Sequence, residues 1–414
     1  APSTNTAQLY VDRDGGLWVP TDRGLARRAG EGWQTIGREQ GLEINSDVCL
    51  LQDREGSLWI GLGGGGLARW LGYNRWESWT TAEGLSNPEV WSIARDTGGT
   101  LWAGTESGLS VLGGAPRRWK TASPRAGLDR DRIRAVFPHR DGRMWIGASP
   151  GGVSRLDPRT GAVEAFGPGS GLDNDRVTSL RGDAAGRVWV TTWGGVFRSR
   201  AGGRTFERLD VPGVSDDHFS NLLEDRQGRM WVSGAQGLAV WNGTAWQRFT
   251  TAHGLKNGNV QRLAEAPDGS IWIGYLEGLG VSRLSLAAGQ PRIVHFTREN
   301  GLRSDKPIFL ATDRRGWLWL GSDEGLDVYN GELWRHFGSG DGLVWNDCSA
   351  NAVLVDGDGS VWIGTSRGLS HFRPPADLFH PDDEKGPPVV ITGLKFGDGG
   401  GAVAEPHRVP YDDR

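Results

Sequence analysis

Apolar and polar residues alternate along the chain in short blocks that return at a long, regular interval. Each block runs from an acidic or turn-forming stretch to Gly, then one further residue, an aliphatic residue, Trp and another small or aliphatic residue. The motif occurs nine times, and its tryptophans, spaced 41 to 47 residues apart, are Trp18, Trp59, Trp102, Trp145, Trp189, Trp231, Trp272, Trp319 and Trp362. Self-similarity at such a period is typical of repeat architectures, so we interpret the chain as nine units.

The repeat at 87–121 shows which structure one unit predicts. Asp96 and Gly99 are typical of a hairpin turn, with Asp bonding its own backbone and Gly supplying a positive φ. The apolar-rich segments around this turn predict four short strands at 90–94, 101–104, 109–112 and 118–121. Four antiparallel strands in about 43 residues form one blade of a β-propeller, so the predicted fold class is all-β.

The motif tryptophans are predicted to be core residues that pack between neighbouring sheets. A second mark, Gly followed by Leu, precedes the first strand of most repeats, for example at Gly84 and Gly171. The two marks leave no room for a separate domain, so we expect residues 1–375 to be propeller.

Composition narrows the function classes. The chain has 66 Gly and 21 Trp among 414 residues, which fits many short strands joined by tight turns. A net charge of −4 gives no sign of a nucleic-acid-binding surface. No apolar stretch approaches the roughly 20 residues of a membrane span.

Because the sequence opens without Met or a signal-like segment, we expect a processed or cropped product. Cys49 and Cys348 are expected to be free.

Several repeats resemble the two-component regulator propeller repeat. The segments that carry the resemblance are Leu-Trp-Ile-Gly at 58–61, Met-Trp-Ile-Gly at 144–147, Ile-Trp-Ile-Gly at 271–274 and Val-Trp-Ile-Gly at 361–364. At the other end, 387–396 and 409–414 resemble the opening of the three-tyrosine immunoglobulin-like domain that follows such propellers. We therefore expect residues 376–414 to be a linker and the truncated start of a β-sandwich.

The resemblance implies a sensor. In this family the propeller and sandwich form the periplasmic part of an inner-membrane receptor, joined through a membrane helix to a histidine kinase, hybrid kinase-regulator or diguanylate cyclase. The implied partners are a small-molecule ligand such as a carbohydrate, the sandwich and output module of the same receptor, and a second copy where the receptor forms a homodimer. No catalysis, cofactor or metal is implied.

The number of repeats departs from the family pattern. Members commonly carry seven-bladed rings, whereas this chain has nine repeats without a linker-like break. One arrangement is a single nine-bladed ring, and the other is two blades followed by a complete seven-bladed ring. Two separate blades would expose sheet faces and edges, so we expect the single ring of nine.

Candidate ligand-binding residues lie where the repeats differ from one another. In a propeller, the loops before the first strands share a face with the loops between second and third strands; we call it the variable face. At three positions on this face an aromatic residue stands where other repeats have a small or polar residue. An aromatic ring beside amide, carboxylate and guanidinium groups suits a sugar-like ligand. The predicted ligand-binding residues are Trp193, Tyr275, Glu277, Trp345, Asn174, Arg176, Asn87 and Asp347.

Two other function classes remain open. The segment 151–161 also resembles repeats of streptogramin-lyase-type propellers, whose activity rests on a metal-bound carboxylate and His; Asp217 and His218 could supply such groups. A passive protein-interaction scaffold is the third class. The Asp-Gly-Asp-Gly sequence at 356–359 resembles a calcium loop, but Arg367 occupies the position where that loop needs Glu.

Overall fold

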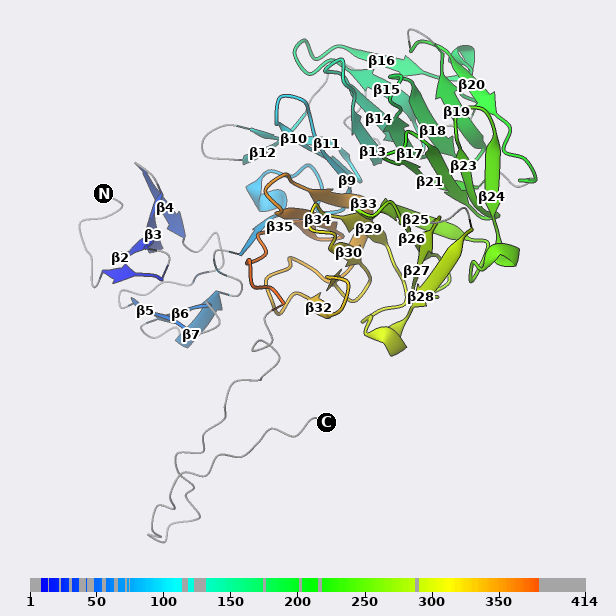
Figure 1. Ribbon diagram of the computed structural model, residues 1–414. Coiled ribbons are helices and arrows are strands. Elements are labelled where there is room, and N and C mark those ends of the chain that lie inside the picture. Colours follow the sequence, from blue (N-terminus) through cyan, green and yellow to red (C-terminus); the bar gives the residue numbers. More distant parts are fainter. Residues whose placement is uncertain are drawn as a thin grey trace. The chain divides into compact units, whose positions relative to one another are not determined.

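The computed structural model describes residues 9–379 apart from short gaps (Figure 1). The gaps are 14, 22–23, 30–31, 37–41, 43–47, 54–56, 63–65, 71–72, 74, 114–117, 123–131, 174–175, 201–202, 215–217 and 287–289. Residues 1–374 form one compact unit, and the described part is built from antiparallel sheets, which confirms the predicted all-β propeller fold. Of residues 376–414, expected to be a linker and the truncated start of a β-sandwich, 380–414 lie outside the described residues.

Two sheets come first along the chain. The first has four strands in sequence order, and the second has three. Their strands are β1 (Tyr10–Val11), β2 (Leu17–Thr21), β3 (Gly24–Ala29) and β4 (Gly32–Ile36), then β5 (Val48–Gln52), β6 (Leu58–Leu62) and β7 (Gly66–Trp70). Leu51 and Leu67 on the three-stranded sheet are largely exposed.

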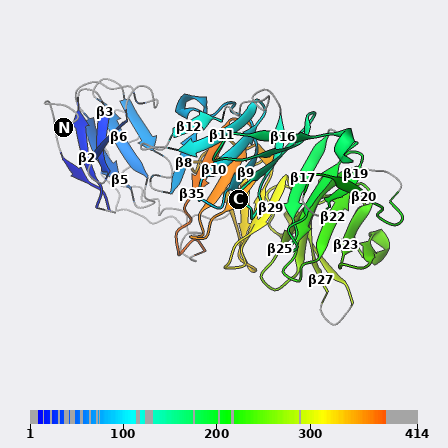
Figure 2. The same cartoon turned by 90° about the horizontal axis from the view of Figure 1, so that it is seen from above.

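The remaining strands make seven four-stranded sheets, which Figure 2 shows turned by 90°. Each sheet is ordered from an innermost to an outermost strand. The first three blades are β9 (Val90–Arg95), β10 (Leu101–Thr105), β11 (Gly108–Gly113), β12 (Arg118–Thr121); β13 (Ile133–Pro138), β14 (Met144–Ala148), β15 (Gly152–Leu156), β16 (Val163–Phe166); and β17 (Val177–Gly182), β18 (Val188–Thr192), β19 (Gly195–Ser199), β20 (Phe206–Leu209).

The next three blades follow the same order. They are β21 (Phe219–Glu224), β22 (Met230–Gly234), β23 (Gly237–Trp241), β24 (Trp246–Phe249); β25 (Val260–Glu265), β26 (Ile271–Tyr275), β27 (Val281–Ser285), β28 (Arg292–Phe296); and β29 (Phe309–Thr312), β30 (Leu318–Gly321), β31 (Leu326–Tyr329), β32 (Trp334–Phe337). The seventh blade combines β33 (Cys348–Val355), β34 (Val361–Thr365) and β35 (Gly368–Phe372) with β8 (Trp76–Trp79).

The seventh blade closes the ring with a strand from far earlier in the chain. Strand β8 pairs antiparallel with β35, so that Trp79 lies opposite Leu369 and Trp76 opposite Phe372. Trp76 stacks on Phe372 with ring centroids 4.2 Å apart. The innermost strands contact one another in sequence from β9 to β33, and β33 lies against β9. Seven blades therefore close on themselves.

The expected single ring of nine blades is wrong for this structure. In such a ring β8 would complete the sheet of β5, β6 and β7, but it pairs with β35 instead. The described sheets fit the other arrangement, two blades followed by seven in a ring. The physical reason is that aromatic burial against Phe372 and Trp362 in the seventh blade stabilises the pairing of β8 there.

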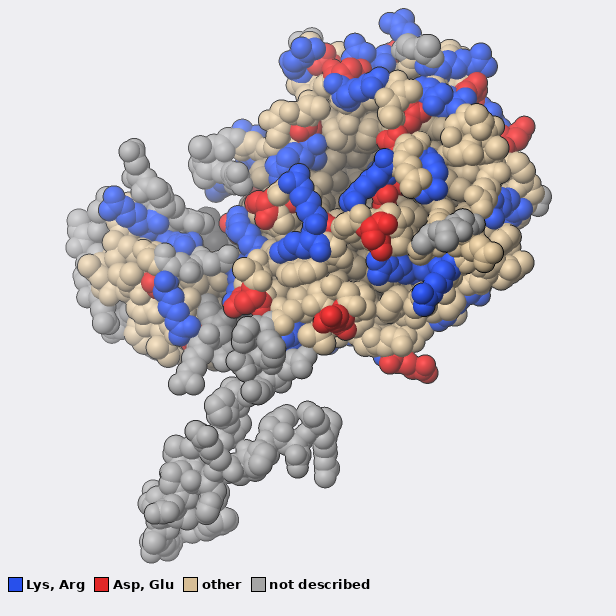
Figure 3. All heavy atoms as spheres, viewed as in Figure 1, with Lys and Arg blue, Asp and Glu red and all other residues tan. Residues whose placement is uncertain are grey.

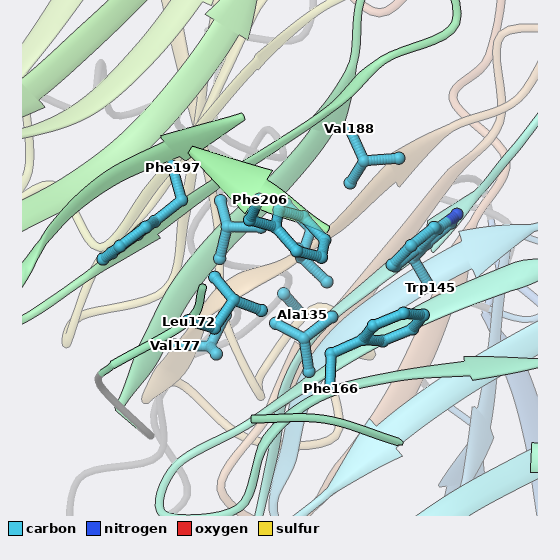
Figure 4. Packing of buried hydrophobic residues seen from close by; sticks show 11 residues of the cluster. Ala135, Trp145, Phe166, Leu172, Val177, Val188, Phe197 and Phe206 are labelled. Carbon is cyan, nitrogen blue, oxygen red and sulfur yellow. The ribbon is translucent and has the colours of Figure 1, made fainter. Parts of the chain in front are cut away.

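The motif tryptophans fill the space between neighbouring blades, as predicted. Trp145, 1% exposed, stacks on Phe166 at 5.1 Å and meets the edge of Phe206 at 5.9 Å (Figure 4). Leu172 and Val177 of the next blade complete this cluster. Burial of one such indole contributes a few kcal/mol, about 2–4, to stability.

The repeated Gly-Leu mark has a structural role at the blade-to-blade connection. Four connections contain a single 3₁₀ turn that ends at a glycine with φ between 88° and 100°. The turns are η2 (Thr81–Glu83), η3 (Pro168–Ser170), η4 (Thr251–His253) and η6 (Arg298–Asn300). The leucine after each glycine, such as Leu85 at 4% exposed, is buried and anchors the connection.

Candidate functional site

The two sets of loops on the variable face are joined by a recurring backbone hydrogen bond. In six of the seven ring blades, the first residue after the second strand donates its N–H to a backbone carbonyl in the loop before the first strand. The accepting residue is the one that directly precedes the first strand. The donor and acceptor pairs are Glu106 and Glu89, Ser149 and Arg132, Trp193 and Arg176, Ala235 and His218, Leu276 and Asn259, and Ser366 and Asp347. This bond brings residues about 17 positions apart in the sequence side by side.

Trp193 is the most exposed tryptophan on this face. Its side chain is 48% exposed and lies on the loop between β18 and β19. The Arg176 guanidinium lies 4.6 Å from the indole centroid, and the His218 ring lies 5.4 Å away at a tilt of 56°. Trp193 and Arg176, two of the predicted ligand-binding residues, thus lie side by side, and His218 joins them from the next blade.

Trp345 repeats this arrangement in the seventh blade. It precedes β33, is 37% exposed, and lies 3.6 Å from the guanidinium carbon of Arg367. Asp347, two residues later, is exposed and accepts the backbone N–H of Ser366 through its carbonyl. An indole face against a guanidinium is a favourable cation–π contact of about 0.5–1 kcal/mol at an exposed site.

Asn87 and Glu277 are tied into local hydrogen bonds. Asn87 accepts the backbone N–H of Glu89 at 2.9 Å and donates to the Ser107 hydroxyl at 3.1 Å, so its amide orders the loop before β9. Glu277 is exposed and accepts from the Asn259 amide at 2.9 Å. Glu277 remains accessible to a ligand, whereas the amide of Asn87 is committed to its loop.

Tyr275 is corrected from a surface residue to a core residue. It is the last residue of β26 and is fully buried. Its hydroxyl lies 2.9 Å from the Ser282 hydroxyl and accepts the Lys256 backbone N–H at 3.2 Å. Burial raises the pKa of the Tyr275 phenol. Asn174 lies outside the described residues.

A charged network that includes none of the predicted ligand-binding residues lies on the variable face of the first and second ring blades. Glu106 accepts two hydrogen bonds from the Arg132 guanidinium, at 2.6 and 2.5 Å, and one from Nε1 of Trp91 at 2.7 Å. The Arg134 guanidinium lies 3.8 Å above the Trp91 ring. Trp91 is not one of the nine motif tryptophans. This departure from the repeat was the sequence feature that could have pointed to the network.

Two carboxyl groups of this network, those of Glu89 and Glu106, have pKa values shifted in opposite directions. Burial raises the pKa of Glu89, and the negative charges of Glu106 and Asp347 raise it further, against the opposing effect of Arg132 and Arg134. Burial also acts to raise the pKa of Glu106, but the bonds from Arg132 and Trp91 outweigh it and lower the pKa. Glu106 is therefore held as an anion, while Glu89 takes up a proton more readily.

The central channel of the ring is crossed by one side chain. Four residues of β33, 349–352, face the single residue Gly364 of β34, so the strand bulges. Asn351 lies in this bulge with φ of 57°, the only positive φ of a non-glycine residue in the described chain. Its amide donates to the carbonyls of Arg134 and Thr178, at 3.3 and 3.0 Å, and accepts from Asn221 at 3.4 Å. The seventh blade thus touches the second, third and fourth.

Two hollows lie away from the predicted site. One of about 410 Å³ is lined by the hairpin turns of the first three blades, including Thr97 and Arg140, and by Glu224. Another of about 490 Å³ extends from Arg140 to Arg155 and Arg200. Figure 3 shows Lys and Arg side chains mixed with Asp and Glu on the visible face, including around a hollow in the ring.

Metal-ligand and membrane signals are absent from the residues that the structure describes. Among them, no group of three His, Cys, Asp or Glu side chains comes together as a metal site. The described part of the chain also contains no helix with the length and hydropathy of a membrane span.

Solved structures share this fold. The extracellular domain of a B. thetaiotaomicron protein named as a hybrid two component system matches 98% of the chain, with TM-score 0.73 and 18% identity. A second B. thetaiotaomicron extracellular domain, from a protein named as a one component system, matches 88% with TM-score 0.58 and 19% identity. The chain covers 56% and 52% of those two structures, so it spans about half of their length.

An enzyme has a similar ring. Virginiamycin B lyase from Staphylococcus aureus matches 72% of the chain and 98% of its own length, with TM-score 0.57 and 11% identity. At these identities the likeness shows the fold alone. No curated protein sequence matches the chain.

A family comparison identifies three of the repeats. Residues 84–107, 171–194 and 213–236 match the family described as two component regulator propeller. Each matched segment begins within the connection between two blades and ends in the loop after the second strand, so it contains one motif tryptophan. The resemblance seen in the sequence is thus confirmed: these three segments are two component regulator propeller repeats.

Proposed function

We propose that this chain is the ligand-sensing, non-catalytic extracytoplasmic part of a transmembrane signalling receptor. Its binding site would lie on the variable face of the seven-bladed ring. The observation that carries the proposal is the repeated pairing of a half-exposed tryptophan with an arginine, Trp193 with Arg176 and Trp345 with Arg367.

The chemistry of these pairs suits a small polar ligand with apolar faces, such as a carbohydrate. An indole ring presents a flat apolar surface, and a guanidinium at its edge presents directed N–H donors. Exposed indoles otherwise leave apolar area in contact with water, which is unfavourable unless a ligand covers them. Glu277 and Asp347 would add acceptors for hydroxyl groups on the same face.

The fold shared with extracellular domains of proteins named as two component systems supports a periplasmic location and a larger receptor. The partners would be a β-sandwich and a membrane-spanning output module of the same receptor, and a second copy of the chain in a homodimer. A ligand transmits a signal only if it binds two arrangements of the receptor with different affinity. Contacts between the ring and its neighbours would therefore change on binding.

The test is a thermal-shift and calorimetry screen of the whole chain against mono- and oligosaccharides, amino acids and divalent metal ions. A specific ligand raises the unfolding temperature, and above Kd the rise grows with the logarithm of the ligand concentration. We expect Trp193→Ala and Trp345→Ala to weaken binding about tenfold or more each. Trp33→Ala is the matched control, because Trp33 is 39% exposed but lies on the first N-terminal sheet.

Each rival function gives its own outcome in this screen. A response to metal ions alone would favour a lyase-like enzyme; at present His218, the histidine that this rival needs, packs its ring against Trp193. A passive interaction scaffold would bind no small molecule in any arm. If Trp33→Ala weakens binding as much as the two variants on the ring do, the assignment of the site to the variable face is wrong.

A further inference from the structure

One carboxylate collects two side-chain donors in the hairpin turns of the third and fourth ring blades. In the third blade, Asp183 accepts from Nε1 of Trp189 at 2.9 Å and from Nε of Arg187 at 2.7 Å. In the fourth blade, Asp225 accepts the equivalent pair of bonds at 2.7 and 2.6 Å. An indole N–H and a guanidinium N–H thus converge on an oxyanion in each blade.

The second ring blade has the indole but not the carboxylate. His139 stands six residues before Trp145, where the neighbouring blades have Asp. Its Nε2 lies 3.1 Å from the Gly186 carbonyl and its Nδ1 lies 2.8 Å from Oδ1 of Asp141, so both ring nitrogens are engaged elsewhere. Trp145 is 1% exposed, and its Nε1 is buried with no hydrogen-bond partner among the described residues. A buried donor without an acceptor is unfavourable.

The second donor of the neighbouring blades is present here as well. Arg143 lies two residues before Trp145, the position that Arg187 and Arg229 have before their own motif tryptophans. Its Nη1 is 3.9 Å from Oδ2 of Asp141, which is beyond hydrogen-bond distance, and its side chain is 45% exposed. The second blade therefore keeps both donors and lacks the group that accepts from them.

A hollow of about 490 Å³ adjoins this donor pair, and His139, Arg143 and Trp145 are among its lining residues. In the seven repeats that have the aspartate, the indole Nε1 is directed at the residue six positions earlier. Nε1 of Trp145 is accordingly directed toward the His139 side of the hollow. The hollow lies at the hairpin-turn end of the second and third blades, opposite the variable face, so it is separate from the ligand site proposed above.

The lining of this hollow carries an excess of positive charge. It has one carboxylate, that of Asp141, and five guanidinium groups, those of Arg140, Arg143, Arg155, Arg187 and Arg200. Three of these arginines pair with carboxylates outside the lining: Arg155 with Glu164, Arg187 with Asp183, and Arg200 with Glu207. Arg140 has no ion pair among the described residues, and its guanidinium donates to the neutral carbonyls of Ala184 and Ala185. Four carboxylates thus face five guanidinium groups, which favours a further anion.

We propose that this hollow binds an oxyanion, such as the carboxylate of a small organic acid, at the place that the aspartate carboxylate has in the neighbouring blades. The anion accepts from Nε1 of Trp145 and from the Arg143 guanidinium, as Asp183 accepts from Trp189 and Arg187. Because the Arg143 side chain is partly exposed, it can turn toward the anion without disturbing the core. A carboxylate and a phosphate group share this chemistry, and the experiment distinguishes them.

The test titrates the whole chain with sodium acetate and with sodium phosphate, while sodium chloride keeps the ionic strength constant. NMR of protein with ¹⁵N-labelled tryptophan reports the indole N–H groups, and the signal that is missing from Trp145→Phe belongs to Trp145. We expect at least one of the two oxyanions to shift this signal in a saturable manner, because the anion becomes the acceptor of that N–H. The oxyanion with the lower Kd is the one that the site prefers.

Two variants test where the anion lies. His139→Asp supplies the missing carboxylate, so its affinity for the oxyanion should fall at least about tenfold below that of His139→Ala, which loses the same imidazole and gains no carboxylate. Arg143→Gln removes one donor and should weaken binding by a similar factor. Arg159→Gln is the matched control, because Arg159 belongs to the same blade, is 85% exposed and does not line the hollow. Its variant should bind as the wild type does.

The opposing results are distinct. Equal affinities of His139→Asp and His139→Ala, or binding that survives in Arg143→Gln, place the anion elsewhere and overturn the site. A Trp145 signal that responds to chloride as it does to the oxyanions reports screening of charge alone and overturns it too. So does the absence of a saturable shift with both acetate and phosphate. The proposed sensor site on the variable face stands or falls separately, in the ligand screen.

Discussion

Nε1 of Trp231 donates a 2.7 Å hydrogen bond to Oδ2 of Asp225, six residues earlier in the chain. The same bond, at 2.7 to 3.2 Å, recurs in Trp18–Asp12, Trp59–Asp53, Trp102–Asp96, Trp189–Asp183, Trp319–Asp313 and Trp362–Asp356. The aspartate also accepts backbone N–H groups of its own turn, for example that of Arg229 at 2.9 Å. One carboxylate thus orders the hairpin and satisfies the buried indole, which explains why Asp and Trp recur together.

The second ring blade lacks this bond, and it can be restored. His139 stands six residues before Trp145, and Nε1 of Trp145 is buried without a partner. We expect His139→Asp to be more stable than His139→Ala by about 1–3 kcal/mol in urea unfolding, because a buried donor gains its acceptor. Both variants lose the contact of His139 with the Gly186 carbonyl, 3.1 Å in length, so their difference isolates the new bond. Equal stability of the two variants would contradict it.

The ring closure should weaken in acid. Bonding to His371 holds the pKa of Glu77 low, burial opposes this, and Arg373 adds to it, so that the value falls from 4.5 to about 2. A lowered folded-state pKa contributes stability above pH 4.5 that is lost as the pH falls toward 2. We expect the unfolding free energy of Glu77→Gln to fall less over this interval than that of the wild type. Glu299→Gln, an exposed residue without an ion pair in the described chain, should behave as the wild type.

A designed disulfide can test which strand β8 completes. Ser78 lies opposite Ser370, with their hydroxyl oxygens 3.1 Å apart. Ser78→Cys with Ser370→Cys should therefore oxidise readily and raise the unfolding free energy by at most about 5 kcal/mol, because the bridge closes a very long loop. Peptide mapping by mass spectrometry identifies the bridge.

The matched pair for that experiment is Ser78→Cys with Ala68→Cys. Ala68 has the register position on β7 that Ser370 has on β35, since each faces the residue after the motif tryptophan. A nine-bladed ring would place Ser78 beside Ala68. We expect no bridge between these positions, and efficient formation of one would refute the seven-bladed closure.

The blades were predictable because each is specified locally. Turn residues such as Asp96 and Gly99 and the apolar segments around Trp102 determine a hairpin without help from distant chain. The closure was not predictable in the same way. Strand β8 reads Trp-Glu-Ser-Trp, so its two tryptophans face opposite sides of the sheet, and this pattern fits the edge of β7 as well as that of β35. Only the packing of the whole ring decides between them.

The sequence indicates at which strand end a candidate residue lies, but its exposure depends on its exact position, and a difference of one residue changes it. Trp193 follows Trp189 by four positions and lies on the surface, as does Leu276, four positions after Trp272. Tyr275 follows its motif tryptophan by three positions and points into the core. Because successive side chains of a strand face opposite sides, an offset of one residue exchanges a ligand plate for a core residue.

The buried position of Tyr275 predicts that Tyr275→Phe affects stability and not ligand binding. Loss of the hydroxyl leaves the Ser282 hydroxyl and the Lys256 N–H with one partner fewer, which we expect to cost about 1–2 kcal/mol in thermal or urea unfolding. Affinity for any ligand found in the screen should stay at the wild-type value, in contrast to Trp193→Ala. A loss of affinity without a loss of stability would return Tyr275 to the binding site.

Asn351 should be the most sensitive polar residue of the channel. Replacing it with Gly removes its three hydrogen bonds but suits a φ of 57°, whereas Ala removes the same bonds and keeps the unfavourable backbone conformation. We therefore expect both variants to unfold more easily than the wild type, with Asn351→Ala less stable than Asn351→Gly by about 1 kcal/mol. Urea unfolding of the three proteins measures this order. If the Ala variant were the more stable of the two, the bulge of β33 would not hold its left-handed residue in solution, and the side chain that crosses the channel would have to come from another conformation of that strand.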